Sequence, residues 1–159
     1  TFHRAFDRCA NPMLALEQLC ELGIDRILTS GQQPTAEQGI DLLRTLNKAA
    51  AGRIKILAGC GVNENNISKI HEETGVNEFH FSARIPVKSH MQYANPNVYM
   101  GDKDADESTL MYTSAERVMA TISNVGFPYS ILGKILVILS HKLLPSPLKT
   151  KGNNKNKQR

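Results

Sequence analysis

The sequence has few cysteines and no paired cysteine motif. Its three cysteines, Cys9, Cys20 and Cys60, are odd in number, and no two of them form a CxxC pair. Disulfide frameworks and structural zinc sites need several cysteines at matched spacings, so the sequence argues against both. Free thiols are typical of a reducing compartment. We therefore predict a cytoplasmic protein, for which the nucleus is also an open location.

Acidic residues are absent from the last part of the chain. Residues 125–159 carry seven Lys or Arg and no Asp or Glu, which leaves 12 basic and 15 acidic residues in 1–124. Because the excess of basic charge belongs to this segment, the rest of the chain has no predicted nucleic-acid surface, and we expect no nucleic-acid partner. The split predicts a folded domain over 1–124 and a divergent tail over 125–159.

A hydrophobic run of membrane-spanning length is also missing. The apolar segment Ile131–Leu144 is interrupted by a glycine and two lysines and is too short to cross a bilayer, so we predict no transmembrane segment. It fits either a helix that covers exposed protein surface or a helix in a membrane interface. The end of the chain, Lys149–Arg159, is rich in lysine and asparagine and is expected to be disordered.

What the sequence does contain is a repeated strand–helix pattern. We predict strands over 1–7, 25–30, 54–58 and 78–82, and helices over 11–22, 35–51, 63–75 and 114–124. Strands that begin roughly 24 to 29 residues apart, with a helix between them, are typical of parallel βαβ crossovers. No strand is followed by a complete GxGxxG motif, which argues against a dinucleotide-binding sheet. The pattern therefore predicts an α/β fold with four of the eight βα units of a TIM barrel.

Two segments of this pattern carry further expectations. The strand over 1–7 has no upstream partner for its open edge, which predicts that the chain is part of a larger barrel. Residues 85–112 show neither helical nor strand periodicity and are predicted to form a partly ordered flap, in which Met91, Tyr93 and Met100 pack.

The first predicted strand holds candidates for acid–base chemistry. Strand alternation puts His3 and Asp7 on the face opposite Phe2 and Phe6, which points them into the mouth of a barrel. An imidazole near a carboxylate is suited to general acid–base catalysis or to metal binding. The alternative is that His3 is a hydrogen-bonded core residue. Arg4 either binds an anion or ties down a carboxylate of a loop.

The turns after the strands are candidates for anion binding. Small residues there bring backbone N–H groups near helix N-termini, and a guanidinium adds a charge-assisted donor. The alternative is that the glycines only permit tight turns. The anion-binding candidates are Arg4, Ser30, Gly31, Gly59, Gly61, Ser82 and Arg84.

Several motifs, taken together, resemble those of one protein family. They are TFHRAFD at 1–7 with Asn11-Pro12, LGIDRILTSG at 22–31, GCGV at 59–62, and EFHFSAR at 78–84 with Met91 and Tyr93 beyond it. With these motifs the chain resembles the CutC family of copper homeostasis proteins over residues 1 to about 122. The resemblance implies a TIM barrel that handles copper and has no assigned reaction, and this chain corresponds to its second half. It also implies that the cysteines proposed to hold copper in the family lie in the first half.

A copper site, as implied by this resemblance, would need soft donor atoms. Cu(I) prefers thiolate, thioether or imidazole, which makes Cys60, His3 and His80 the metal-site candidates, with Met91 and Met100 as further donors. His3 and His80 belong to predicted strands three apart, about 14 Å along the barrel wall at about 4.8 Å per strand, and are poor co-ligands.

Two functions follow from these residues. The first is a non-enzymatic protein of copper homeostasis that binds copper, with a homo-oligomer left open. The alternative is a TIM-barrel enzyme that acts on a small substrate bearing a phosphate or carboxylate. In that case His3 and Asp7 are the acid and base, and Arg4 or Arg84 clamps the anion.

Overall fold

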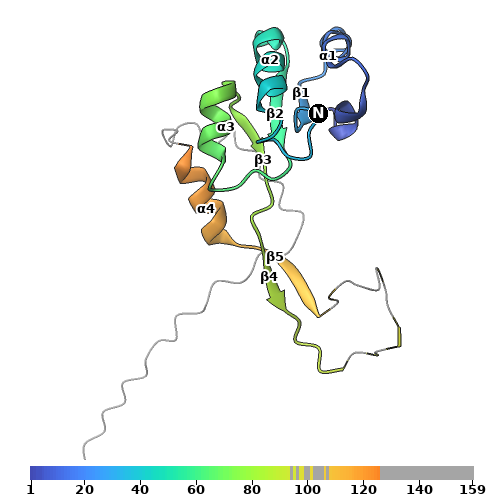
Figure 1. The fold of residues 1–159 in the computed structure, drawn as a ribbon, viewed down its shortest axis with the longest axis vertical. Helices are drawn as coiled ribbons and strands as arrows, with labels where there is room; N and C mark the ends of the chain where they lie inside the picture. Colours follow the sequence, from blue (N-terminus) through green and yellow to red (C-terminus); the bar gives the residue numbers. More distant parts are fainter. Residues whose placement is uncertain (94, 96, 99–100, 102–105, 107, 126–159) are drawn as a thin grey trace, which may run out of the picture.

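A parallel three-stranded sheet forms the centre of the fold (Figure 1). The computed structural model describes residues 1–93, 95, 97–98, 101, 106 and 108–125. The strands β1 (Arg26–Thr29), β2 (Lys55–Gly59) and β3 (Glu78–His80) lie in the order β1-β2-β3, and each neighbouring pair is parallel. The predicted α/β fold with parallel crossovers is therefore confirmed. Met100 and the predicted tail beyond residue 125 lie outside the described residues.

Helices alternate with these strands and then continue past the sheet. They are α1 (Pro12–Glu21), α2 (Ile40–Ala50), α3 (Ile67–Thr74) and α4 (Ala115–Asn124), each in contact with the next in sequence order. Local caps set two of the starts, because the Asn11 side chain accepts a hydrogen bond from Leu14 N and the Ser114 hydroxyl accepts one from Arg117 N. No helix in the described part of the chain is long and apolar enough to cross a membrane.

The second helix begins later than predicted. The Thr35 hydroxyl accepts a hydrogen bond from Gln38 N at 3.3 Å, as a capping residue does. The chain makes only a turn there, and α2 begins at Ile40, after Gly39.

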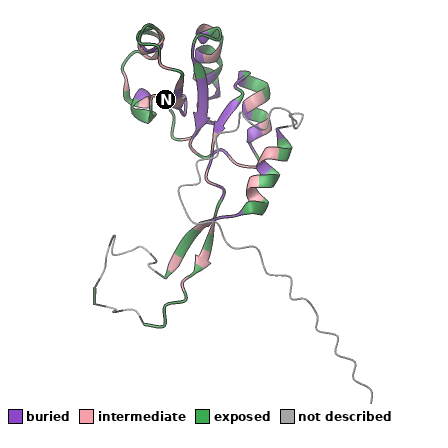
Figure 2. Ribbon diagram, turned by 180° about the vertical axis from the view of Figure 1, so that it is seen from behind, coloured by how far each residue is buried: buried purple, intermediate pink, exposed green. Residues whose placement is uncertain are grey.

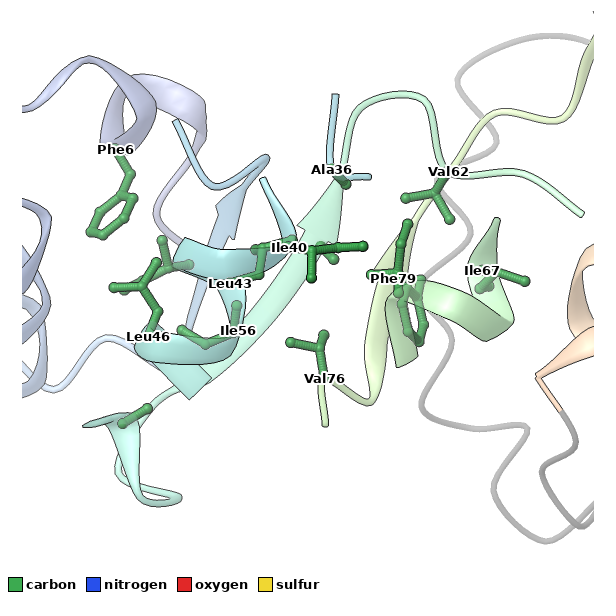
Figure 3. Close-up of a cluster of buried hydrophobic side chains, with 14 of the residues drawn as sticks. Phe6, Ala36, Ile40, Leu43, Leu46, Ile56, Val62, Ile67, Val76 and Phe79 are labelled. Carbon is green, nitrogen blue, oxygen red and sulfur yellow. The ribbon is translucent and has the colours of Figure 1, made fainter. Parts of the chain in front are cut away.

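The main hydrophobic core lies between the helices and one face of the sheet (Figure 3). Ile27, Ile56 and Phe79 come from the three strands, and they pack with Leu43 of α2 and Ile67 of α3. All five side chains are buried. This face follows the alternation of the strands, because Ile27 and Ile56 are partners in register.

The opposite face of the sheet carries its own layers of side chains. Glu78 is buried and forms ion pairs with Arg26 at 3.0 Å and with Lys55 at 3.2 Å, near the amino ends of the strands. Leu28 and Leu57, partners in register, form the next layer. A barrel interior is likewise filled by layers of side chains that point inward from its parallel strands. The described sheet consists of three strands, and the four-unit half barrel stays a prediction.

The predicted strand over residues 1–7 is largely wrong. Only Phe2 joins the sheet, through a parallel bridge to Ile27 in which Phe2 N donates to Arg26 O. The chain then turns into a 3-10 helix, η1 (Arg4–Arg8), whose first turn is capped by the His3 imidazole accepting from Ala5 N. This cap holds the turn, so the predicted alternation of faces fails beyond His3.

The predicted irregular flap over 85–112 is wrong at its two ends. These ends form β4 (Arg84–Lys88) and β5 (Thr109–Thr113), which pair antiparallel into a ribbon that projects from the rest of the fold (Figure 1). Most of this ribbon is exposed or half-buried (Figure 2). Met91 and Tyr93 are 77% and 74% exposed, so the predicted packing of these two side chains is also wrong.

Candidate functional site

The carboxyl ends of the parallel strands meet at one edge of the sheet and surround a pocket. The pocket has a volume of ≈ 340 Å³. Its lining comes from η1, from β1, and from the segments that end β2 and β3 and begin β4. The lining residues are Arg4, Leu28, Cys60, Gly61, Val62, His80, Phe81, Ser82 and Arg84. Parallel strands place their carboxyl ends side by side, and this edge is where α/β proteins bind ligands.

Asp7 holds the first turn of the chain to the end of β1. Its carboxylate accepts hydrogen bonds from the Thr29 hydroxyl, from the backbone N–H groups of Ser30 and Gln32, and from Arg4 Nε at 2.7 Å. Burial raises the pKa of Asp7, but the hydrogen bonds from Thr29, Arg4, Gln32 and Ser30 outweigh it and leave the pKa below its usual value. The carboxylate is thus ionised and surrounded by donors of the chain, which suits it to positioning Arg4.

Arg4 reaches from this anchor into the pocket. Its Nε donates to Asp7, its Nη2 donates to the Ser30 hydroxyl at 2.8 Å, and it lines the pocket together with Cys60. The hydrogen bond to Asp7 raises the pKa of Arg4, burial opposes that effect, and the charge and hydrogen bonding of Cys60 add to the increase. Arg4 therefore ties down a carboxylate and also lines the pocket, and anion binding by Arg4 stays a prediction.

Cys60 follows β2 and His80 ends β3, and both line the pocket. Gly59 is the partner of His80 in register, and a Cβ on Gly59 would lie 3.3 Å from the His80 Cβ and 3.4 Å from its Nδ1. The His80 side chain therefore packs against the backbone of Gly59. Burial lowers the pKa of His80, which favours the neutral imidazole that binds metal ions. The Cys60 thiol donates to Pro34 O at 3.1 Å.

Arg84 lines the pocket from the first position of β4. Its backbone is fixed twice, by pairing with Thr113 and by its carbonyl, which accepts from Arg117 Nη1 at 2.7 Å. Arg117 is itself held by Glu64, with Nε and Nη2 donating to the two carboxylate oxygens at 2.9 and 3.0 Å. Among the described residues, no hydrogen bond or ion pair engages the Arg84 guanidinium. The fold therefore presents a positive charge at the pocket without a partner for it in this part of the chain.

The structure separates other predicted candidates from this pocket. His3 is exposed and caps η1, so it does not line the pocket with His80. Gly31 does not line the pocket, and its backbone packs directly against the backbone of Gly39. Ser30 is buried and bonded to Asp7 and Arg4.

Three apolar lining residues were not among the sequence candidates. Leu28, Val62 and Phe81 line the pocket beside the polar side chains. Strand alternation could have found Leu28, because it points opposite to the neighbouring core residue Ile27. The other two follow their strands, where alternation no longer applies.

The described residues hold no complete set of metal ligands. Within them, no group of three or more His, Cys, Asp or Glu side chains is placed to hold one metal ion. Cys60 and His80 are the soft donors that the pocket brings together.

Comparison with known proteins identifies the family. The family model described as CutC family matches residues 1–85, which is more than half of the chain. The chain belongs to the CutC family. The predicted resemblance is therefore confirmed, and the matched residues include η1, the whole parallel sheet and the pocket through Arg84.

Curated CutC relatives match most of this chain with about half of their own length. A protein of Bacteroides thetaiotaomicron named family protein CutC is 58% identical over 126 residues, which covers 79% of this chain and 51% of the relative. A CutC relative from Vibrio cholerae is 43% identical over 132 residues, covering 83% and 52%. A solved structure of the copper homeostasis protein CutC, as it is named, from Streptococcus agalactiae is 35% identical. That match covers 50% of this chain and 40% of the other, with a TM-score of 0.47.

Proposed function

We propose that this CutC family protein serves copper homeostasis without catalysing a reaction, and that it binds Cu(I) through Cys60 and His80. The observation that carries the proposal is the shared position of a thiol and an imidazole on the wall of one pocket. Family membership supports the link to copper. The cytoplasm, where Cu(I) and free thiols both persist, is the proposed location.

The chemistry of these two donors fits a cuprous ion as cargo. Cu(I) is soft and prefers sulfur and imidazole nitrogen, and it binds the thiolate form of cysteine. His80 is neutral at physiological pH because burial lowers its pKa, so no proton has to leave the ring. Cys60 gives up its thiol proton when it binds the ion, as metal-binding cysteines do. His3 lies outside the pocket and takes no part in this site.

Substituting the two donors tests the copper site directly. Cys60→Ser and His80→Gln are each expected to weaken Cu(I) binding about 100-fold, equivalent to about 2.8 kcal/mol, since each removes one of two ligands. The measurement is competition with a chromophoric Cu(I) chelator under anaerobic, reducing conditions. Cys20→Ser and His90→Gln are matched controls outside the pocket and should leave the affinity unchanged. A loss of Cu(I) affinity in Cys20→Ser or His90→Gln, with none in Cys60→Ser or His80→Gln, would contradict the site.

The architecture around this pocket is proposed to be one side of an eight-unit barrel. Three features support this arrangement. The bridge at Phe2 and the three strands are parallel and follow one another in sequence order. Helices pack on one face of the sheet, and the opposite face carries rows of inward side chains such as the Arg26–Glu78 pair. The chain also spans about half the length of its curated relatives. A homo-oligomer stays a prediction.

A second candidate function is binding and conversion of a small anionic substrate. The specific observation in its favour is that Arg4 and Arg84 both line the pocket. Asp7 is already surrounded by donors and His3 lies outside, so the geometry favours His80 as the titratable group in such a site. The second function requires the metal-free pocket to bind an anion, whereas the first function does not.

Thermal melting with simple anions separates the two functions. If a phosphate or carboxylate group is the ligand, millimolar phosphate or acetate should raise the melting temperature of the metal-free protein beyond the effect of equal ionic strength of chloride. Arg84→Gln should remove that rise. Equal melting temperatures in all three salts would contradict the second function.

A further inference from the structure

Two donors leave a cuprous ion open to another ligand. Cys60 and His80 supply one sulfur and one nitrogen, and within the described residues no third His, Cys, Asp or Glu side chain joins them. An ion held by one thiolate and one imidazole can still accept a further ligand from outside the protein. The pocket walls then decide which outside ligand is favoured.

The charges on those walls favour an anion in the outside position. The Arg4 guanidinium is compensated by Asp7 at 2.7 Å, and a Cys60 thiolate is compensated by Cu(I) once the ion is bound. Arg84 is the positive charge that remains, because its guanidinium has no partner among the described residues. A bare cation would meet this charge unfavourably, and an anionic ligand would pair with it.

We infer that the pocket takes Cu(I) as a complex with a small thiol that also carries a carboxylate, whose sulfur binds copper while its carboxylate pairs with Arg84. This inference rests on the proposed function and adds the class of ligand that accompanies the ion. The pocket volume of ≈ 340 Å³ lies within the usual range for small-molecule sites, about 300 to 1,000 Å³. The transfer is a ligand exchange: the complex gives up a bond from copper to another ligand, Cys60 loses its thiol proton to solvent, and copper stays Cu(I).

The experiment compares two thiols that differ in one charged group. Cu(I) is titrated into the full chain in the presence of mercaptoacetate or of 2-mercaptoethanol, and binding is followed by chelator competition and by X-ray absorption at the copper edge. We expect binding about tenfold tighter with mercaptoacetate, the size of effect that one charge-assisted hydrogen bond produces. The absorption spectrum should show two sulfur ligands and one nitrogen ligand.

Variants then locate the origin of the preference. Arg84→Gln should abolish the difference between the two thiols, while Arg84→Lys should retain part of it. Lys88→Gln, which removes a positive charge from the exposed end of the same strand, should leave the difference intact. A preference that survives in Arg84→Gln would overturn the inference.

The outcomes also separate this inference from the function on which it rests. Copper that binds through Cys60 and His80 with equal affinity in both thiols would overturn the inference alone. No copper binding with either thiol, or binding that is insensitive to Cys60→Ser and His80→Gln, would overturn the proposed function and the inference together.

Discussion

Gly31→Ala is expected to destabilise the protein by about 4 kcal/mol, which is most of the stability of a marginal domain. Gly31 has φ +69°, and a Cβ there would lie 2.3 Å from the carbonyl oxygen of Gly39 and 2.9 Å from its carbonyl carbon. The obstacle is backbone, which cannot rotate away as a side chain does. The turn after β1 and the segment that precedes α2 would therefore have to separate.

Gly52→Ala is the matched control for this substitution. Gly52 also has a positive φ, +79°, but no atom lies within 4 Å of the position of its Cβ. Its alanine variant should therefore lose only the left-handed backbone preference, about 1 kcal/mol. Urea unfolding measures both variants. If the Gly31 variant loses no more stability than the Gly52 variant, the close approach of Gly31 and Gly39 is contradicted.

Asp7→Asn is expected to destabilise the protein by about 3 kcal/mol at pH 7. The amide loses the charge that pairs with Arg4, and it presents one acceptor oxygen and one NH2 group to donors that now point at two oxygens. Breaking a buried charged network costs about 3 to 5 kcal/mol, and the partial exposure of Arg4 puts the expected loss at the lower end. The pocket should also lose its fixed Arg4.

The control for Asp7→Asn is Asp41→Asn. Asp41 also pairs with an arginine three residues away, Arg44, but its side chain is 97% exposed, whereas that of Asp7 is 7% exposed. An exposed pair of this kind contributes at most about 1 kcal/mol. Equal losses from the two substitutions in urea unfolding would show that the Asp7 network contributes little.

The pH dependence of Asp7 provides an independent check. The pKa of Asp7 in the folded state is below its unfolded value of about 3.9, so its stabilisation is fully present above that value and is lost as the pH falls through the folded pKa. The difference in unfolding free energy between wild type and Asp7→Asn should therefore be constant from pH 7 to about pH 5. It should shrink below about pH 4, because only the wild type then takes up a proton at this position.

Local signals were enough to predict most helices and strands. Asn11 caps α1, Ser114 caps α4, and Gly75 ends α3 in the left-handed conformation, as expected from residues adjacent in sequence. Pairings between residues far apart in the sequence were harder to predict. β4 and β5 pair across twenty intervening residues, and Pro86 is a residue type that disfavours strand interiors.

Part of the candidate site could be predicted, because local signals in the sequence locate the ends of the strands. Cys60, Gly61 and Arg84 follow predicted parallel strands, and His80 and Ser82 lie near the end of one. The parallel register brings these residues to one edge. The separation of His3 from this group could not be predicted from strand alternation. It depends on a turn at residues 4–8 that leaves the strand pattern.

The amino-acid order alone determined the α/β class, the parallel crossovers and the CutC family motifs, because caps, periodicity and motif spacing act over a few residues. Only the tertiary structure decided which polar groups share the pocket. The Asp7 carboxylate finds its donors at Thr29, which ends β1, and at Ser30 and Gln32 in the turn that follows, and this contact holds η1 and fixes Arg4 at the pocket. Hydrogen bonds between segments more than twenty residues apart exist only once the sheet has brought those segments together, so no local pattern encodes them.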